Sequence, residues 1–279
     1  GIRDKLVTGV QTCLFRSGLT AAWRLNQLGY DVTVYEAADR PGGLVMYGIP
    51  NMKLPKEDVA RRVAVMEKVG VKFICNTRVG VDISGDDLQK QYARVLLAIG
   101  ARMPRELNAS GRQLEGVEQA LDFLADATHA VLNEGTKANT KLAGKKIVVV
   151  GGGDTGNDCI ATALRLGARD ILQLEVVPAA PKQRPDDNPW PEWPRTQRIG
   201  YGQSEYAELS DKPLTRFAHT ITAFHGDDGH VQSITINVAD HFQPGAGTVV
   251  TEDAALASFA LGYVGSAPCW VRVLSSGVS

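Results

Sequence analysis

The residues best suited to chemistry form a glycine-rich turn in the middle of the chain. Residues 151–156 read GGGDTG, which fits the spacing GxGxxG and stands between a predicted strand over 147–150 and a predicted helix over 157–166. In such a turn the first glycine bends the chain, the second admits a pyrophosphate close to the backbone, and the third lets the helix pack on the strand. The positive end of the helix dipole also favours an anion there. We therefore predict a dinucleotide site built from Gly151, Gly152, Gly153, Asp154, Thr155 and Gly156.

The strand before this turn and the helix after it favour a ligand over an empty glycine-rich turn, but they leave the choice of nucleotide open. Glu175, near the end of a predicted strand over 170–177, could accept a hydrogen bond from a ribose 2′-hydroxyl, as in sites for NADH. Lys182 and Arg184, a few residues further on, could pair instead with the 2′-phosphate of NADPH. Both nucleotides therefore remain candidates.

A second candidate site lies near the start of the chain. Glu36 ends a predicted strand eighteen residues after Gly18, which is the spacing of an acid that binds the adenosine ribose of FAD or NAD. Taken alone, Glu36 is as well explained as an ordinary exposed acid. Arg40, Gly42 and Gly43 follow at once and would offer a cation and a close backbone approach to phosphates. Together these residues favour a nucleotide site.

The phosphate turn that should accompany Glu36 has the wrong residues. When Gly18 is taken as the third glycine, the first two glycine positions hold Cys13 and Phe15. Side chains at these positions obstruct the turn, and a phenylalanine ring would fill the space that a pyrophosphate needs. We therefore expect this phosphate loop not to work as written.

Composition and the remaining reactive residues exclude several classes of protein. The chain has 279 residues with 30 Lys and Arg against 31 Asp and Glu, and a net charge of −1 gives no reason to expect nucleic acid as a partner. No apolar run approaches the 18 residues of a membrane span, so no membrane association is expected. The 4 cysteines are scattered and the 5 histidines lack ligand spacing. We therefore predict no metal site and a reducing, cytoplasmic compartment.

The spacing of apolar residues predicts an α/β fold with two nucleotide-binding units in tandem. The expected helices cover 19–28, 56–69, 82–91, 117–132 and 157–166, and the expected strands cover 31–36, 71–75, 94–101, 147–150 and 170–177. Residues 178–195 contain six prolines and are expected to be irregular, and 217–224 with 231–238 should form a hairpin. Trp190 and Trp193 in the proline-rich segment could line a cofactor or a subunit interface, or could be buried to fix the path of their own loop.

Four segments of the chain carry a resemblance to a known family: YEAADRPGGLVMYGIPNMKL, RVLLAIGA, VVVGGGDTGNDC and DNPWPEWPR. With them the chain, from about Gly18 to Gly265, resembles the small (beta) subunit of glutamate synthase, within the wider family of FAD- and NAD(P)H-dependent disulfide-reductase-like oxidoreductases. The first two segments are shared with related electron-transfer modules, including the amino-terminal part of dihydropyrimidine dehydrogenase. The segment DNPWPEWPR is narrower and points to glutamate synthase.

The resemblance implies two nested Rossmann-like, three-layer domains, with the FAD domain interrupted by the NAD(P)H domain and incomplete at both ends. It places a partial FAD-binding domain over 18–115, an NAD(P)H-binding domain over 116–252, and a return to the FAD domain over 253–265. Residues 1–17 resemble a translated sequencing adapter, and 266–279 look like a reading-frame slip. We therefore expect both end segments to be non-native and the chain to be a fragment.

The resemblance also implies the cofactors and the residues that hold them. NADPH or NADH would lie at 151–156, with Arg184 near its adenosine end. In such enzymes the nicotinamide gives a hydride to the flavin, and because positioning of the two rings suffices, no catalytic side chain is expected. The residues expected around FAD are Gly18, Glu36, Arg40, Gly42, Gly43, Leu44 and Lys53, with Val79 and Gly100 nearby.

In enzymes of this kind electrons pass through iron–sulfur clusters to the large (alpha) subunit, which makes glutamate from glutamine and 2-oxoglutarate. The chain is thus expected to be part of the NAD(P)H-oxidising, electron-input subunit that serves ammonia assimilation. In the family the clusters are bound by a cysteine-rich amino-terminal domain, which we expect to be missing here. The alternatives are a related flavin electron-transfer subunit, such as a ferredoxin–NADPH oxidoreductase, and a nucleotide-binding module without catalysis.

Overall fold

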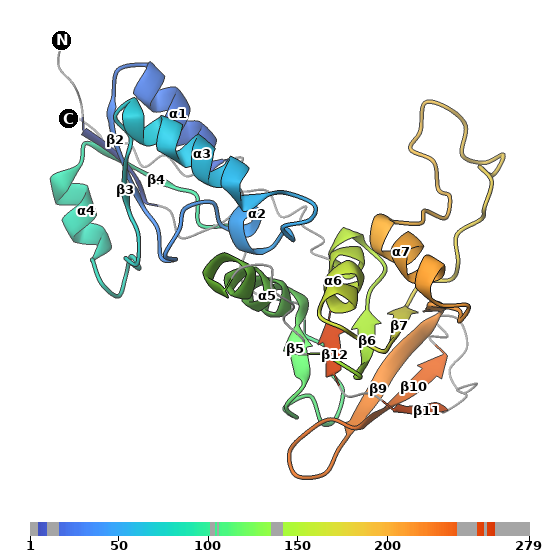
Figure 1. The fold of residues 1–279 in the computed structure, drawn as a ribbon. Helices are drawn as coiled ribbons and strands as arrows, with labels where there is room; N and C mark the ends of the chain where they lie inside the picture. Colours follow the sequence, from blue (N-terminus) through green and yellow to red (C-terminus); the bar gives the residue numbers. More distant parts are fainter. Residues whose placement is uncertain are drawn as a thin grey trace. The chain divides into compact units, whose positions relative to one another are not determined.

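The chain folds into two compact units, each built around a parallel β-sheet (Figure 1). The first unit contains the described residues up to Gly100, and the second contains those from Pro104 onward. This arrangement confirms the predicted α/β class. The computed structural model describes residues 5–9, 17–100, 104, 106–134, 142–238, 250–253 and 256–259.

The first unit has a four-stranded parallel sheet in the order β3-β2-β1-β4. Its strands are β1 (Lys5–Gly9), β2 (Asp31–Tyr35), β3 (Lys72–Ile74) and β4 (Arg94–Leu97). Its helices are α1 (Gly18–Gln27), α2 (Leu44–Tyr47), α3 (Lys56–Lys68) and α4 (Gly85–Gln91).

Alternation along β2 explains the layers of this unit. Val32 and Val34 point to one face of the sheet, where they pack in one apolar cluster with residues of α1 and α3. Tyr35 points to the other face and packs with Leu88 of α4. Because successive strand residues face opposite sides, one short apolar strand can hold helices on both faces. Ser84 caps α4 as its position suggests, since its hydroxyl accepts the Asp87 amide at 3.1 Å.

The second unit has a five-stranded parallel sheet in the order β5-β12-β6-β7-β8 and a separate antiparallel sheet in the order β11-β10-β9. The parallel strands are β5 (Val117–Gln119), β6 (Lys146–Val150), β7 (Asp170–Glu175), β8 (Thr215–Phe217) and β12 (Leu256–Phe259). The other elements are α5 (Ala120–Glu134), α6 (Asp154–Arg165), α7 (Tyr201–Leu209), β9 (His219–His225), β10 (Ser233–Val238) and β11 (Val250–Asp253).

The core of this unit is built on both faces of β6, a run of apolar residues that reads as a strand buried on two sides. Ile147 and Val149 pack with residues of α5, α6 and α7 on one face. Val148 and Val150 pack on the other face with residues of β9 and β10. Helices therefore cover one side of the parallel sheet and the antiparallel sheet covers the other (Figure 1), which is the predicted three-layer arrangement.

The predicted hairpin is confirmed, but its first strand is interrupted. Phe217 ends β8 in the parallel sheet, and His219 begins β9 in the antiparallel sheet. Between them Ala218 has a φ of 55°. A left-handed residue turns the chain sharply, and here it moves the continuous segment 215–225 from one sheet to the other.

The domain boundaries differ from those expected. Residues 106–115 were expected in the first domain, but Ser110 bridges Ala223 and Glu115 bridges His230 in the second unit. The segment 253–265 was expected to return to the first domain, yet β12 fills the place between β5 and β6, with parallel pairing on both sides. Residues 5–9 lie within 1–17, the segment expected to be non-native, and form β1 between β2 and β4. That expectation stays a prediction. The pairings of Ser110, Glu115 and β12 therefore place these residues in the second unit.

Several elements were missed or shifted. The predicted helix 117–132 begins with the short strand β5, and α6 starts at Asp154, inside the glycine turn, rather than at 157. Neither α2 nor α7 was predicted. Apolar spacing leaves the first and last residues of an element least well defined.

Candidate nucleotide-binding site

The glycine turn lies where β6 meets α6. Gly151 has a φ of 108° and its amide donates to the Leu174 carbonyl at 2.8 Å, so the chain turns while still held to β7. Gly153 is the N-cap of α6, and Asp154 begins the helix. The amides of a first helical turn have no partner within the helix, so this turn presents N–H groups and a positive dipole end to an anion.

The glycines of the turn differ in the space beside them. A Cβ on Gly156 would lie 2.2 Å from the Gly151 carbonyl oxygen, so the helix can approach the strand only if this residue is glycine. A Cβ on Gly153 would have no heavy atom within 4 Å, which leaves open space beside the backbone at the helix start. The protein itself does not require glycine at Gly153, whereas a phosphate lying against the backbone would.

The turn also stands at the position in the sheet where such folds bind ligands. It follows the carboxyl end of β6, whose neighbours are β7 on one side and β12 on the other. The chain continues from β6 through α6 to β7, while β5 and β12 lie on the other side of β6. The place where the strand order reverses in this way is called the switch point. In doubly wound sheets the nucleotide binds in the crevice at the carboxyl ends of the strands there.

A buried glutamine on β7 holds the turn in place. The Gln173 side chain is fully buried, and its Nε2 donates to the Gly151 carbonyl at 3.0 Å. Its Oε1 accepts from Gln203 Nε2 at 2.7 Å and from the Thr215 hydroxyl at 2.9 Å. Gln203 Oε1 in turn accepts the Gly200 amide at 2.8 Å. Two glutamines therefore connect the turn to the start of α7.

Sequence reasoning missed this pair of glutamines. The one signal available was a polar residue, Gln173, at an inward position of the apolar strand DILQLE. A buried amide needs partners for all its polar atoms, which points to a specific hydrogen-bonding role. Its partners could not be named, because Gln203 lies thirty residues away in a helix that the apolar pattern does not predict.

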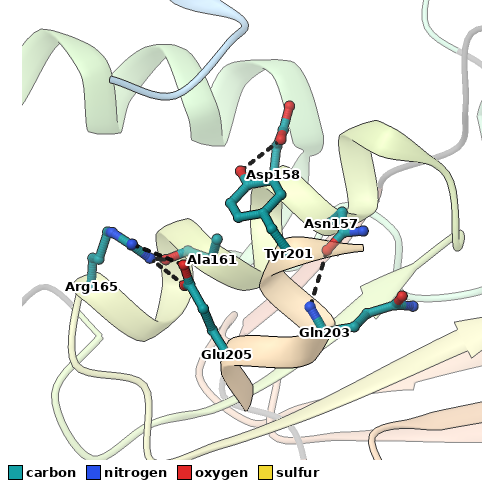
Figure 2. Close-up of polar contacts among 7 residues, drawn as sticks. All are labelled: Asn157, Asp158, Ala161, Arg165, Tyr201, Gln203 and Glu205. Carbon is teal, nitrogen blue, oxygen red and sulfur yellow. Dashed lines mark hydrogen bonds and ion pairs between the residues drawn. The ribbon is translucent and has the colours of Figure 1, made fainter. Parts of the chain in front are cut away.

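Polar contacts fix α7 against α6 (Figure 2). Asn157 Oδ1 accepts the Gln203 amide at 3.1 Å, and the Tyr201 hydroxyl donates to Asp158 at 2.7 Å. Burial, reinforced by Asp158, raises the pKa of Tyr201 well above its usual range, so this hydroxyl keeps its proton.

An ion pair between Arg165 and Glu205 also joins α6 to α7. Arg165 Nη1 and Nη2 lie 2.6 and 3.1 Å from the two carboxylate oxygens of Glu205, and Nη1 also donates to the Ala161 carbonyl (Figure 2). The hydrogen bonds from Arg165 hold the pKa of Glu205 below its usual value. Because both side chains are partly exposed, this bidentate ion pair fixes the orientation of the two helices more than it adds to the stability of the fold.

The acid at the end of β7 lies directly against the glycine turn. The Glu175 carboxylate accepts hydrogen bonds from the backbone amides of Gly152 and Val177, and burial raises its pKa. A Cβ on Gly152 would lie 2.0 Å from Glu175 Oε2. The structure thus brings Glu175 to the predicted site. Arg184, by contrast, is exposed and donates to the Glu192 carbonyl of its own loop at 2.9 Å.

The proline-rich loop between β7 and α7 has an ordered path that does not depend on its tryptophans (Figure 1). Trp190 and Trp193 are 84% and 74% exposed, so the interpretation that they are buried to fix the loop is wrong. The fully buried Asn188 does this instead, with its Nδ2 donating to Glu192 and to the Trp193 carbonyl and its Oδ1 accepting the Arg195 amide. The rings are left on the surface of a fixed loop.

The first unit brings the predicted acid and glycines to one edge of its sheet. Glu36 follows β2 directly, is only 1% exposed and accepts the Ala38 amide at 2.9 Å. It is therefore not an ordinary exposed acid. Gly42 and Gly43, with φ of 128° and 55°, lead into α2, and Gly100, with φ of 65°, follows β4. These positions lie after the carboxyl ends of strands, where a nucleotide binds.

The other predicted residues of this unit have mixed positions. Gly18 is the buried first residue of α1, and Leu44 begins α2. Arg40 pairs with Asp39 at 2.7 Å and donates to the Tyr47 hydroxyl. Lys53 lies exposed in the turn after α2, and Val79 packs beside Tyr35 and Leu88 as part of the core. Cys13 and Phe15, which should obstruct the phosphate loop, lie outside the described residues.

A buried lysine supports the loop that carries Gly42 to Leu44. Lys56 is 1% exposed, and its Nζ donates to the carbonyls of Val45 and Ile49 at 2.9 and 2.6 Å. These carbonyls belong to the end of α2 and the turn that follows it, where a cation is favoured by the helix dipole. The sequence offered no sign of this role, because lysine is seldom buried.

Two hollows lined by described residues lie at the opposite sheet edge, one in each unit. One of about 440 Å³ lies at the amino ends of β2 and β3, and one of about 240 Å³ lies at the amino ends of β6 and β7. Neither contains a residue of the predicted sites. No three His, Cys, Asp or Glu side chains of the described residues gather into a possible metal site. No helix among those residues has the length and apolar character to cross a membrane.

Known proteins support the resemblance. Residues 17–189 match the family model described as pyridine nucleotide-disulphide oxidoreductase. The chain is 44% identical over 220 residues to glutamate synthase (NADH) of Saccharomyces cerevisiae, covering 78% of this chain and 10% of that protein. It is 45% identical over 191 residues to the glutamate synthase (NADPH) small chain of Bacillus subtilis, covering 68% of this chain and 39% of that one. The chain thus spans less than half the length of either relative.

Solved structures agree on the fold. FprA of Mycobacterium tuberculosis in complex with NADPH is 19% identical with a TM-score of 0.63, covering 94% of this chain and 71% of that chain. At this identity the likeness extends to the fold of the two units. The family match covers more than half of the 279 residues. The chain is therefore a member of the pyridine nucleotide-disulphide oxidoreductase family.

Proposed function

We propose that this chain is the NAD(P)H-oxidising part of the electron-input subunit of a glutamate synthase, with FAD as its second cofactor. The observation that carries the proposal is the open space at Gly153, at the start of a helix whose backbone approach is enforced by Gly156. The names of its relatives, a glutamate synthase and a glutamate synthase small chain, supply the reaction. FAD, when bound, accepts a hydride from the nicotinamide.

The residues have separate tasks in this function. The amides of the turn over 151–156 would hold the pyrophosphate of NADH or NADPH, and Gln173 keeps the Gly151 carbonyl turned away from it. Glu36, with the glycines Gly42 and Gly43, would hold the adenosine ribose and phosphates of FAD. A buried carboxylate beside two glycines of left-handed φ fits such a group. No side chain is assigned as acid or base, because hydride transfer needs none.

The partner proposed for this chain is the large subunit, since several of its relatives are named small chains. Electrons from the flavin would reach it through iron–sulfur clusters held outside these residues. A cytoplasmic location is also proposed. It is supported by scattered cysteines, of which Cys75 and Cys159 form no disulfide in the structure.

Titration of the purified full chain tests the function. We expect calorimetry to show saturable binding of NADH or NADPH, and a flavin absorbance band in protein loaded with FAD. A colourless chain that still binds the nicotinamide nucleotide would support the second candidate, a nucleotide-binding module without catalysis. This candidate is favoured by Phe15 at the second glycine position of the flavin fingerprint. Binding of neither nucleotide would contradict both.

The exposed tryptophans give a prediction about the partner. Replacing Trp190 and Trp193 together by alanine should weaken binding to the large subunit at least about tenfold, because exposed tryptophans on a fixed loop are frequent hot spots. The measurement is biolayer interferometry against the large chain of the Bacillus subtilis enzyme. Thermal unfolding should not change, since Asn188 holds the loop.

Val81→Ala, which removes another exposed apolar side chain from the first unit, is the matched control and should bind normally. Equal affinities for the double variant and the parent chain would show that the tryptophans do not contact the large subunit.

A further inference from the structure

The middle glycine of the turn, Gly152, lies directly against the side chain of Glu175. Gly152 is not one of the three glycines of the spacing GxGxxG, yet a Cβ there would collide with a neighbouring side chain as it is placed. The atom in the way is Glu175 Oε2, 2.0 Å from the position of a Cβ. The Glu175 carboxylate also accepts the Gly152 amide. Gly152 therefore makes room for an acid that is held against the phosphate-binding turn.

The place of this carboxylate determines which group of a dinucleotide it would meet. Glu175 ends β7, the strand beside β6, and in this class of sheet the adenosine ribose lies over the end of that strand. A carboxylate only accepts hydrogen bonds, so it suits a 2′-hydroxyl, which donates one. A 2′-phosphate carries negative charge and would be repelled, the more strongly because Glu175 is half-buried.

The cations of the loop between β7 and α7 do not offset the negative charge of Glu175. Arg184 donates to the Glu192 carbonyl, and Arg195 pairs with Asp187 at 3.1 Å. Arg198 lies over the Trp193 ring at 4.3 Å. Three of the four basic residues between β7 and α7 therefore have partners within the loop, and Lys182 is left as the remaining cation.

We propose that the site selects NADH over NADPH and that Glu175 determines this choice by binding the 2′-hydroxyl of the adenosine ribose. The inference rests on the proposed function, because it needs a dinucleotide at the glycine turn. It adds the identity of the reductant and the role of Gly152. Gly152, the middle of the three consecutive glycines, lets the acid lie against the turn.

The test compares NADH and NADPH titrations of the full chain by calorimetry, first for the parent and then for Glu175→Gln. We expect the parent to bind NADH at least about tenfold more tightly than NADPH. Glu175→Gln keeps the size of the side chain and an acceptor oxygen while removing the charge. NADPH affinity should therefore rise, and the ratio of the two affinities should fall about fivefold or more.

Two further variants complete the test. Asp186→Asn removes one negative charge from the exposed part of the neighbouring loop and should leave the ratio unchanged. Arg184→Ala should leave NADPH affinity unchanged, and a selective loss of NADPH affinity in this variant would overturn the inference.

The outcomes separate the inference from the function on which it rests. If neither nucleotide binds the parent chain, the proposed function fails. If both bind and NADPH binds as tightly as NADH, or if Glu175→Gln leaves the ratio unaltered, the function stands and the choice by Glu175 is wrong. Thermal unfolding shows whether Glu175→Gln folds as well as the parent chain. If it folds poorly, the ratio of NADH to NADPH affinity in the parent chain decides the test.

Discussion

Gly153→Val removes dinucleotide binding and leaves the second unit folded. A side chain at Gly153 meets no protein atom within 4 Å, so it enters the space beside the start of α6 rather than the core. That space is where a pyrophosphate must lie to reach the amides of the turn. Branched methyl groups there exclude the phosphate and cannot move away, because Val has a stiff χ1. We expect affinity for the nucleotide to fall at least about a hundredfold, measured by calorimetry.

The stability of the same variant should change little. Gly153 has a φ of −75° and a ψ of −175°, which any residue adopts, and a poorer N-cap costs about 1 kcal/mol or less. Gly85→Val is the matched control, because Gly85 also stands at a helix start in open space but belongs to the first unit. Nucleotide affinity within twofold of the parent for Gly153→Val would show that the phosphate does not approach this backbone.

Gly156→Ala should have the opposite effect and unfold the second unit. A Cβ there would lie 2.2 Å from the Gly151 oxygen and 3.2 Å from its carbonyl carbon. Both are backbone atoms, so neither can turn aside as a side chain could, and α6 must move away from β6. Because α6 packs in the main apolar cluster through Cys159, Ile160 and Ala163, we expect a loss of about 3 kcal/mol or more in the free energy of unfolding.

Urea denaturation followed by circular dichroism measures this loss. Gly153→Ala serves as the control, since it adds the same methyl group three residues earlier in open space. Equal midpoints for the two alanine variants would mean that the strand and helix are not in close contact at Gly156. Loss of nucleotide binding in Gly156→Ala would then have to be explained without unfolding.

The parts of the site that could be predicted from the sequence depend on contacts close together in the chain. The strand β6, the glycine turn and the presence of a helix after it follow from residues 146–166, because a short apolar run and glycine positions act within a few residues. Glu36 and Glu175 could be placed at strand ends for the same reason. Their burial against neighbouring turns was not evident, because it depends on other segments.

The parts that could not be predicted depend on partners far apart in the chain. Gln173 and Gln203 meet across thirty residues, and no periodic pattern signals a polar pair. The kink at Ala218 comes from sheet pairing on both sides and not from a turn-forming residue. Trp190 and Trp193 belong to a residue type that is usually largely buried, and only the contacts of Asn188 show why this loop can leave them outside.

The two glutamines have a thermodynamic consequence for the whole nucleotide-binding unit. They join the Gly151 carbonyl to the Gly200 amide, which ends the tryptophan-bearing loop. A ligand that stabilises the turn would therefore also stabilise the end of that loop through these hydrogen bonds, and linkage between two sites is reciprocal. A protein that docks on the tryptophans would alter the dissociation constant of the nucleotide by the same factor by which the nucleotide alters docking.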